Sequence, residues 1–271
     1  MDILEKIKET AEFLRSKGFK SPDAGIVLGT GLGGLSTAIE NQIGIPYADI
    51  PNFMISTVKG HAGRLICGDF GGKRVVAMQG RFHYYEGYGS EQVTFPIRVM
   101  KELGIRALFL SNAAGGTNPA FRIGDIMIIN DHISLLPNPL IGPNDDRIGP
   151  RFPDMSKAYD RDLIARADAI AARLGIEVTH GLYLSTTGPT FETPGEYRHF
   201  RMIGADAVGM STTPEVITAR HMDVPVFAVS IITDLGVDGK IEYTTHESVQ
   251  QAAEKSEVKM TEIIKELIAT L

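Results

Sequence analysis

Short runs of consecutive apolar residues recur along this chain of 271 residues. Near-continuous valine, isoleucine and leucine are typical of strands that are covered on both faces of a sheet. The first such run lies at 24–28 and leads directly into a glycine-rich segment. Further strands are predicted at 63–68, 73–79, 106–111, 125–130, 178–186, 205–209 and 225–232.

Between many of these runs, apolar residues recur at a spacing of three or four, which indicates amphipathic helices. The longest is predicted from about 246 to 269, and shorter ones at 3–17, 90–103, 160–174, 195–203 and 214–222. Strands that alternate with helices predict an α/β fold, with a mostly parallel or mixed sheet covered by helices. There is no internal repeat or low-complexity linker, so we interpret residues 1–271 as a single domain.

Composition and charge exclude several classes of protein. The net charge is −6 and no basic stretch interrupts it, so a nucleic-acid partner is not expected. Cys67 is the single cysteine, which rules out an intramolecular disulfide and fits a reducing compartment. No apolar run approaches the roughly 20 residues of a membrane span, and the charged start Met1–Lys6 is unlike an export signal. We therefore expect a cytoplasmic protein without a membrane partner.

The glycine-rich segment Gly29-Thr-Gly-Leu-Gly-Gly34 matches the first half of a dinucleotide-binding fingerprint. The second half, a strand ending in an acid about 20 residues later, fails because Pro46 and Pro51 interrupt that region and proline is excluded from central strands. The backbone N–H groups of such a turn can still hold an anion, with the hydroxyl of Thr30 in support. Phosphate is favoured, a dinucleotide is the weaker alternative, and a tight turn without a ligand stays open.

Three further segments lie at predicted strand ends, where open α/β sheets place their ligands. Arg81 and His83 alternate, so in an extended segment they would face the same side and could receive an oxyanion; a plain polar loop is an equal alternative. The small residues of 111–117 would let a ligand approach the backbone, although a sharp turn is the simpler interpretation. Ser211 precedes a helix expected to begin near Pro214, which makes it an anion ligand or an ordinary N-cap.

Taken together, these segments resemble the trimeric purine nucleoside phosphorylases, from Gly29 to the C-terminal helix. The motifs that carry the resemblance are Gly29-Thr-Gly-Leu-Gly33, Gly60-His-Ala-Gly-Arg64, Gln79-Gly-Arg-Phe-His83, Asn112-Ala-Ala-Gly-Gly116, Gly188-Pro-Thr-Phe-Glu192 and the stretch 204–215. Each motif is weak alone, but their joint occurrence in this order is specific. The resemblance implies an α/β fold with a mixed central sheet and a second smaller sheet, assembled as a homotrimer.

The resemblance also implies roles for individual residues. The phosphate site would comprise Thr30, Arg81, His83, Ala113 and Ser211, with His61 on a loop that closes over it. The family usually has serine at the position of Thr30, and either hydroxyl can donate to phosphate. The nucleoside site would comprise Tyr85 and Met210 at the ribose, His246 near the 5′-hydroxyl, Phe191 against the purine, and Glu192 and Asp234 as the pair that reads the base. Phe152 matches a residue that family members insert into a neighbouring subunit's site.

Nucleoside cleavage passes through an oxocarbenium-like centre, as glycoside cleavage does. Phosphate would supply the nucleophile, and a donor near N7 of the purine would stabilise the departing base. No residue is needed as a covalent nucleophile. No cofactor or metal is expected, because the seven histidines show no close-spaced ligand motif and Cys67 stands alone.

Asp234 leaves the base preference open. Family enzymes that act on 6-oxopurines typically carry asparagine there, whose amide donates to the base, whereas an ionised carboxylate only accepts. Glu192 and His246 favour inosine and guanosine, while Asp234 favours 6-aminopurine nucleosides. Asp234 could also turn away from the base and leave its place to Thr233 or water. The chief expectation is phosphorolysis of inosine and guanosine; the alternatives are a 6-aminopurine-accepting or methylthioadenosine phosphorylase, a nucleosidase that uses water, and a catalytically silent binding protein.

Overall fold

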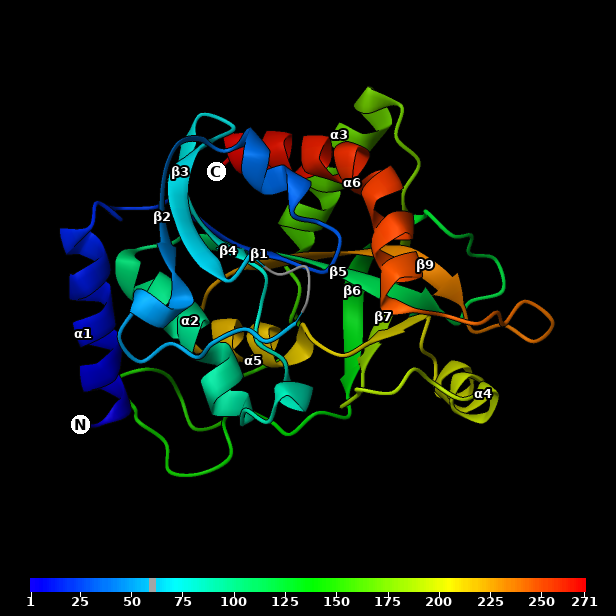
Figure 1. Cartoon of the computed structure of the whole chain (residues 1–271), viewed down its shortest axis with the longest axis horizontal. Helices are drawn as coiled ribbons and strands as arrows, with labels where there is room; N and C mark the ends of the chain where they lie inside the picture. Colours follow the sequence, from blue (N-terminus) through cyan, green and yellow to red (C-terminus); the bar gives the residue numbers. More distant parts are fainter. Residues whose placement is uncertain (59–61) are drawn as a thin grey trace.

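A computed structural model describes residues 1–58 and 62–271, in which strands and helices alternate (Figure 1). The strands are β1 Ala24–Leu28, β2 Glu40–Pro46, β3 Arg64–Phe70, β4 Lys73–Gln79, β5 Ala107–Gly116, β6 Ile126–Ser134, β7 Thr179–Ser185, β8 Ala207–Gly209 and β9 Val226–Leu235. The α-helices are α1 Ile3–Ser16, α2 Ser90–Leu103, α3 Arg161–Leu174, α4 Pro194–Met202, α5 Thr213–His221 and α6 His246–Ala269.

The strands form one hydrogen-bonded network of mixed direction, in the order β2-β3-β4-β1-β5-β8-β7-β6-β9. β1 pairs in parallel with β4 and β5, whereas β2, β3 and β4 are antiparallel. An additional parallel pairing of β5 with β9 closes a ring of β5, β8, β7, β6 and β9. The α/β class with a mixed central sheet is confirmed, and the smaller set of strands, β6 to β8, joins the central strands at both ends through β5 and β9.

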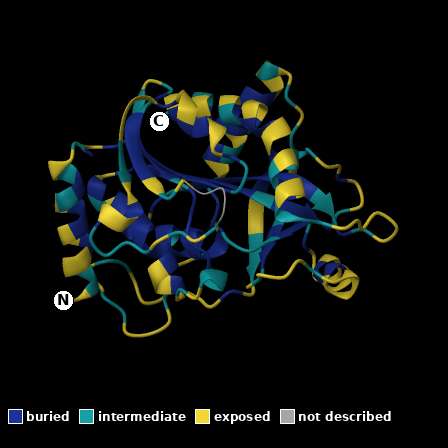
Figure 2. Ribbon diagram, viewed as in Figure 1, coloured by how far each residue is buried: buried dark blue, intermediate teal, exposed yellow. Residues whose placement is uncertain are grey.

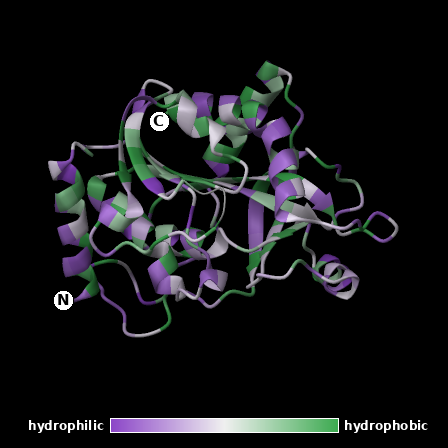
Figure 3. Cartoon of the chain, viewed as in Figure 1, coloured by the Kyte–Doolittle hydropathy of each residue, from purple (hydrophilic) through white to green (hydrophobic). Residues whose placement is uncertain are grey.

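Helices cover the sheet in two groups, which Figure 1 shows on opposite sides of the strands. One core packs α1, α2 and α5 against the sheet through residues such as Leu14, Val99 and Val216. The other packs α3 and α6 through Leu163 and Met260. Figure 2 shows that the central strands are almost wholly buried between the helices, and Figure 3 that the helices alternate between hydrophobic and hydrophilic residues. This is the burial on both faces that the apolar runs predicted.

Two strands differ from the sequence prediction. β2 was not predicted, because two prolines interrupt its region; it forms an antiparallel edge strand against β3, and its last residue is Pro46, where proline is tolerated. The failure of the dinucleotide fingerprint nevertheless holds, since β2 is not the parallel inner strand that the fingerprint requires. β5 continues through Gly116 instead of turning after Ser111, because its far half pairs with β9 and β8.

The described residues 135–160, between β6 and α3, contain neither helix nor strand. This stretch is rich in proline, and a loop of this length inside a compact domain is usually functional. Phe152 lies in it with 88% of its surface exposed, and the guanidinium of Arg151 lies 5.8 Å from the centre of its ring. Cys67, by contrast, is a small core residue buried in β3.

Candidate active site

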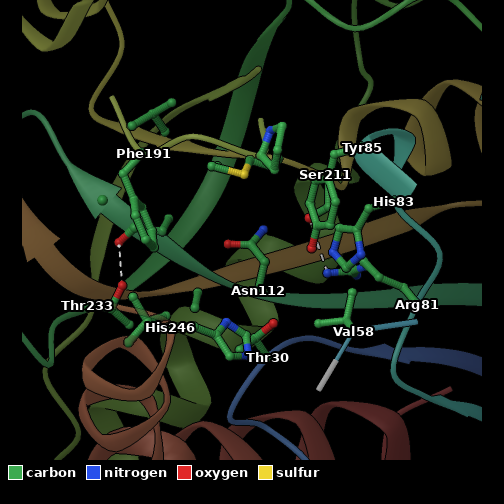
Figure 4. A pocket seen from close by; sticks show the side chains of 18 of the residues that line it. Thr30, Val58, Arg81, His83, Tyr85, Asn112, Phe191, Ser211, Thr233 and His246 are labelled. Carbon is green, nitrogen blue, oxygen red and sulfur yellow. Dashed lines mark hydrogen bonds between the residues drawn. The ribbon is translucent and has the colours of Figure 1, made fainter. Parts of the chain in front are cut away.

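A cavity of about 450 Å³ opens where β5 and β9 meet the segments that follow β1, β4 and β8. Arg81, His83 and Ser211 lie together in one part of the view in Figure 4, and Phe191 and Thr233 lie in another. His61 lies outside the described residues, and Phe152 does not line this cavity. The other residues predicted for the site all line it: Thr30, Arg81, His83, Tyr85, Ala113, Phe191, Glu192, Met210, Ser211, Asp234 and His246.

The guanidinium of Arg81 is the cation at the end where phosphate was expected. Only 1% of Arg81 is exposed, and its Nε donates to Oε1 of Glu215 at 3.0 Å. One terminal nitrogen donates to the carbonyl of Ser111 at 2.8 Å and to Oγ of Ser211 at 3.3 Å. A buried ion pair with these further hydrogen bonds fixes the orientation of the guanidinium before any ligand arrives.

Ser211 is placed by a tight turn at the start of α5. Thr212 has φ +72° and ψ −54°, and the N–H of Thr213 donates to the carbonyl of Ser211 at 2.8 Å, which defines a strained three-residue turn. Nδ2 of Asn112 holds this turn by donating to Oγ1 of Thr212 at 2.9 Å. Such strain is maintained only where the surroundings impose it, often at ligand sites. Ser211 therefore faces the cavity beside the N-terminus of α5, where the helix dipole favours an anion.

Glu86, which the sequence analysis missed, holds His83 in place. Its Oε1 accepts from the backbone N–H of His83 at 2.7 Å and lies 3.2 Å from Nδ1 of the same ring, while Oε2 accepts from the N–H and hydroxyl of Thr57. Burial raises the pKa of Glu86, but these hydrogen bonds outweigh burial and lower its pKa to about 2. Burial lowers the pKa of His83. An Nδ1–H donor to Glu86 makes Nε2 the acceptor nitrogen of the neutral ring.

The glycine-rich turn differs from its expected role in one respect. The N–H of Leu35 donates to Oε1 of Glu257 on α6 at 3.0 Å, and a Cβ at Gly34 would lie 2.6 Å from Oε2 of the same carboxyl. Gly31 packs just as closely on α6, since a Cβ there would lie 2.9 Å from Cβ of Ala253. The far part of the turn thus binds an anion of the protein itself, and Thr30 is its side chain at the cavity.

Two carboxyl groups, of Glu192 and Asp234, lie at the end where the base was expected. Burial raises the pKa of both, and the charge of Asp234 raises that of Glu192 further. Oδ1 of Asp234 accepts from the hydroxyl of Thr233 and Oδ2 from that of Tyr197, each at 3.0 Å. Asp234 therefore lines the cavity together with Thr233 instead of being replaced by it. Tyr197 was not predicted, because it reaches the site from α4 and no local pattern marks it.

Comparison with known proteins agrees with this geometry. The model of the phosphorylase superfamily matches residues 23–269. A purine nucleoside phosphorylase 1 of Geobacillus stearothermophilus is 49% identical over 98% of this chain and 97% of its own. The purine nucleoside phosphorylase of Rattus norvegicus is 46% identical over 98% and 95% of the two chains. This chain belongs to the purine nucleoside phosphorylase family.

Solved structures of the family share the whole fold. A purine nucleoside phosphorylase of Schistosoma mansoni in complex with adenosine superposes with a TM-score of 0.94, at 42% identity over 99% of this chain and 98% of that one. A schistosoma purine nucleoside phosphorylase in complex with hypoxanthine gives 0.93, at 42% identity and the same coverage. The resemblance seen in the sequence motifs is thereby confirmed at the level of family and fold.

Among residues 1–58 and 62–271, no group of three or more His, Cys, Asp or Glu side chains is arranged to hold a metal ion. No helix in the described part of the chain is long and apolar enough to cross a membrane.

Proposed function

We propose that this chain catalyses the reversible phosphorolysis of purine nucleosides and deoxynucleosides to the free base and (deoxy)ribose 1-phosphate. The observation that carries the proposal is one cavity that has a buried arginine beside a histidine and a serine in its lining, together with two carboxyl groups. We interpret the first group as an anion receptor and the carboxyl groups as the part that reads the base. The receptor consists of Arg81, His83 and Ser211, with Thr30 and the backbone of Ala113 beside them. Phosphate is a co-substrate here, and the chemistry requires no cofactor.

Held by Arg81, His83 and Ser211, a phosphate oxygen attacks C1′ of the ribose as the bond from C1′ to N9 of the purine breaks. The sugar passes through an oxocarbenium-like state, and the bonding pair leaves with the purine. Tyr85 and Met210 contact the ribose, and His246 binds near the 5′-hydroxyl. Phe191 packs on the purine, and Glu192 and Asp234 read its edge. In this scheme the protein contributes position and electrostatic stabilisation, not a covalent nucleophile.

Inosine and guanosine are the chief substrates in this proposal, because a carboxylate of Glu192 can accept from N1–H of a 6-oxopurine and from the 2-amino group of guanine. One observation supports a second candidate, in which 6-aminopurine nucleosides are accepted. Asp234 faces the cavity with hydroxyl donors on both its oxygens, so it can accept a hydrogen bond from an exocyclic amine. Methylthioadenosine is less favoured, since His246, which we expect near the 5′ group, lines the cavity.

Base release from inosine, guanosine, adenosine and methylthioadenosine, each with and without phosphate, tests this function. We expect turnover only when phosphate is present, with inosine and guanosine cleaved fastest. Cleavage that ignores phosphate would show a nucleosidase, and the absence of cleavage would show a binding protein. Preference for methylthioadenosine would move the substrate assignment to the alternative branch of the family.

We further propose that residues 1–271 act as one domain, that the protein works in the cytoplasm in purine salvage, and that it assembles as a homotrimer. Support for the assembly comes from Phe152, whose large exposed ring lies in the long loop before α3 and contributes nothing to its own cavity. In a trimer Phe152 would complete a neighbouring subunit's site. A monomer by light scattering with full activity would refute both the trimer and this role of Phe152.

A further inference from the structure

Tyr197 lies behind the base-reading end of the cavity and is 4% exposed. It stands in the first turn of α4, which Thr193 caps by accepting from the N–H of Glu196 at 3.2 Å. Its hydroxyl donates to Oδ2 of Asp234 at 3.0 Å. Tyr197 does not line the cavity of about 450 Å³, but it lines an adjoining hollow of about 280 Å³ that Asp234 also lines. It therefore contacts the carboxyl from beside the cavity.

Two glycines make room for this contact. A Cβ at Gly236 would lie 1.9 Å from Cδ1 of Tyr197, so only glycine allows the ring to pack there. A Cβ at Gly115, on β5, would lie 2.8 Å from Oδ2 of Asp234 and 3.2 Å from the hydroxyl of Tyr197. The phenol and the carboxyl therefore meet in a space that two different backbone segments leave open.

The hydroxyl of Tyr197 and the carboxyl of Asp234 are matched as hydrogen-bond donor and acceptor. Burial raises the pKa of Tyr197 well above its ordinary value, so its hydroxyl keeps its proton and stays a donor. A carboxyl oxygen is an acceptor with lone pairs left for a second donor. With Tyr197 on Oδ2 and Thr233 on Oδ1, the plane of the carboxyl is fixed and its remaining acceptor capacity faces the cavity.

Purines differ at position 6 in whether the substituent donates or accepts hydrogen bonds. A 6-amino group donates hydrogen bonds, whereas a 6-oxo group only accepts them. An oriented carboxyl that presents acceptor capacity therefore favours the 6-amino group, while a carboxyl free to rotate loses that preference. We propose that Tyr197 is a positioning residue that sets the discrimination between 6-amino and 6-oxo purines by holding the carboxyl of Asp234. The inference rests on the proposed phosphorolysis.

The test compares wild type with Tyr197→Phe, which keeps the ring and removes one hydroxyl. The quantity measured is kcat/KM for adenosine divided by kcat/KM for inosine, at saturating phosphate. Any change at the phosphate-binding residues, such as His83, affects both substrates equally and cancels in this ratio. We expect this ratio to fall by roughly three- to tenfold, the range that one hydrogen bond supplies. Inhibition by free adenine and free hypoxanthine gives the same comparison for binding alone and should shift in the same direction.

Two further variants make the test specific. In an Asp234→Ala background, Tyr197→Phe should change the ratio by less than about twofold, because the carboxyl through which Tyr197 acts is gone. Tyr159→Phe removes another buried hydroxyl, one that lies 3.1 Å from Nδ1 of His132 outside the cavity, and should leave the ratio unchanged.

If Tyr197→Phe lowered kcat/KM for adenosine and inosine by the same factor, Tyr197 would have only a structural role and the inference would be overturned. The inference would also be overturned by an effect on the ratio that persists in the Asp234→Ala background, or by a wild-type enzyme that cleaves inosine but neither cleaves adenosine nor binds adenine. A wild-type protein that cleaves no purine nucleoside with phosphate would instead refute the proposed function itself.

Discussion

At the end of the cavity where we propose that phosphate binds (the phosphate end), Arg81 is buried against Glu215 and its guanidinium is fixed by hydrogen bonds to Ser111 and Ser211. At the end where we propose that the purine binds (the base end), Glu192 and Asp234 are held by hydroxyl groups, and burial raises the pKa of both. The first region pairs opposite charges inside the protein, whereas the second brings two like charges together. The orientation of Arg81 is therefore fixed by an ion pair and hydrogen bonds, whereas the base end depends on the protonation and the orientation of its carboxyl groups.

Replacing Arg81, at the phosphate end, should have the largest effect on activity and stability. Arg81→Gln removes the cation, and we expect kcat/KM to fall about 1000-fold, in line with the loss of a preorganised electrostatic contact. It also leaves Glu215 buried without its partner, which should cost about 3–5 kcal/mol of unfolding free energy. Steady-state kinetics with varied phosphate and chemical denaturation measure the two effects.

Two variants control this experiment. Arg74→Gln removes an arginine of β4 whose partner, Asp69, lies 3.0 Å away and is half-exposed. It should change stability by no more than about 1 kcal/mol and leave activity unchanged. Arg81→Gln combined with Glu215→Gln should restore stability without restoring turnover. Activity within tenfold of wild type in Arg81→Gln would contradict the assignment of the phosphate site.

Glu86→Gln should have the next largest effect, because it weakens the hold on His83 while keeping the shape of the side chain. We expect kcat/KM to fall roughly 10- to 100-fold, the range of one charge-assisted hydrogen bond. Since folding lowers the pKa of Glu86 to about 2, its contribution to stability is present above about pH 4.3, the ordinary glutamate value, and is lost as the pH falls toward 2.

The stability difference between wild type and Glu86→Gln should accordingly be large at pH 7 and shrink at pH 3, as thermal unfolding at both values would show. Glu12→Gln, on the exposed side of α1, serves as control and should change neither quantity. A difference that stays constant with pH would mean that the Glu86 carboxylate is not stabilised by these contacts.

Asp234→Asn tests the base end and should have the smallest effect of the three substitutions. Folding raises the pKa of Asp234, so its protonated form is favoured: the associated stability is complete below about pH 3.9 and is lost as the pH rises through the folded value. Asparagine does not titrate, so the unfolding free energy of Asp234→Asn relative to wild type should be higher at pH 8 than at pH 4, by on the order of 1 kcal/mol. The opposite sign would show that the Asp234 carboxylate is favoured in its ionised form.

The sequence predicted which residues line the cavity better than it predicted the strands and the turn around them. Local patterns identified residues at strand ends, such as Arg81 and Ser211, because the carboxyl ends of strands meet at one edge of a sheet. They missed β2, since an edge strand tolerates proline, and they ended β5 early, since Gly115 and Gly116 form a strand only through pairing with β8 and β9. They also assigned an open anion site to the whole glycine-rich turn, whereas Glu257 binds its far part.

The sequence by itself determined the α/β class, through apolar runs and helical spacing, and the chemistry available at the site, through its order of motifs. Only the tertiary structure decided which groups hold the reacting residues: Glu215 on Arg81, Glu86 on His83, and Tyr197 on Asp234. Two of these partners come from elements more than 30 residues away, so no local pattern relates them. They are brought together by sheet register and by glycines that leave space, and both are properties of the packed chain.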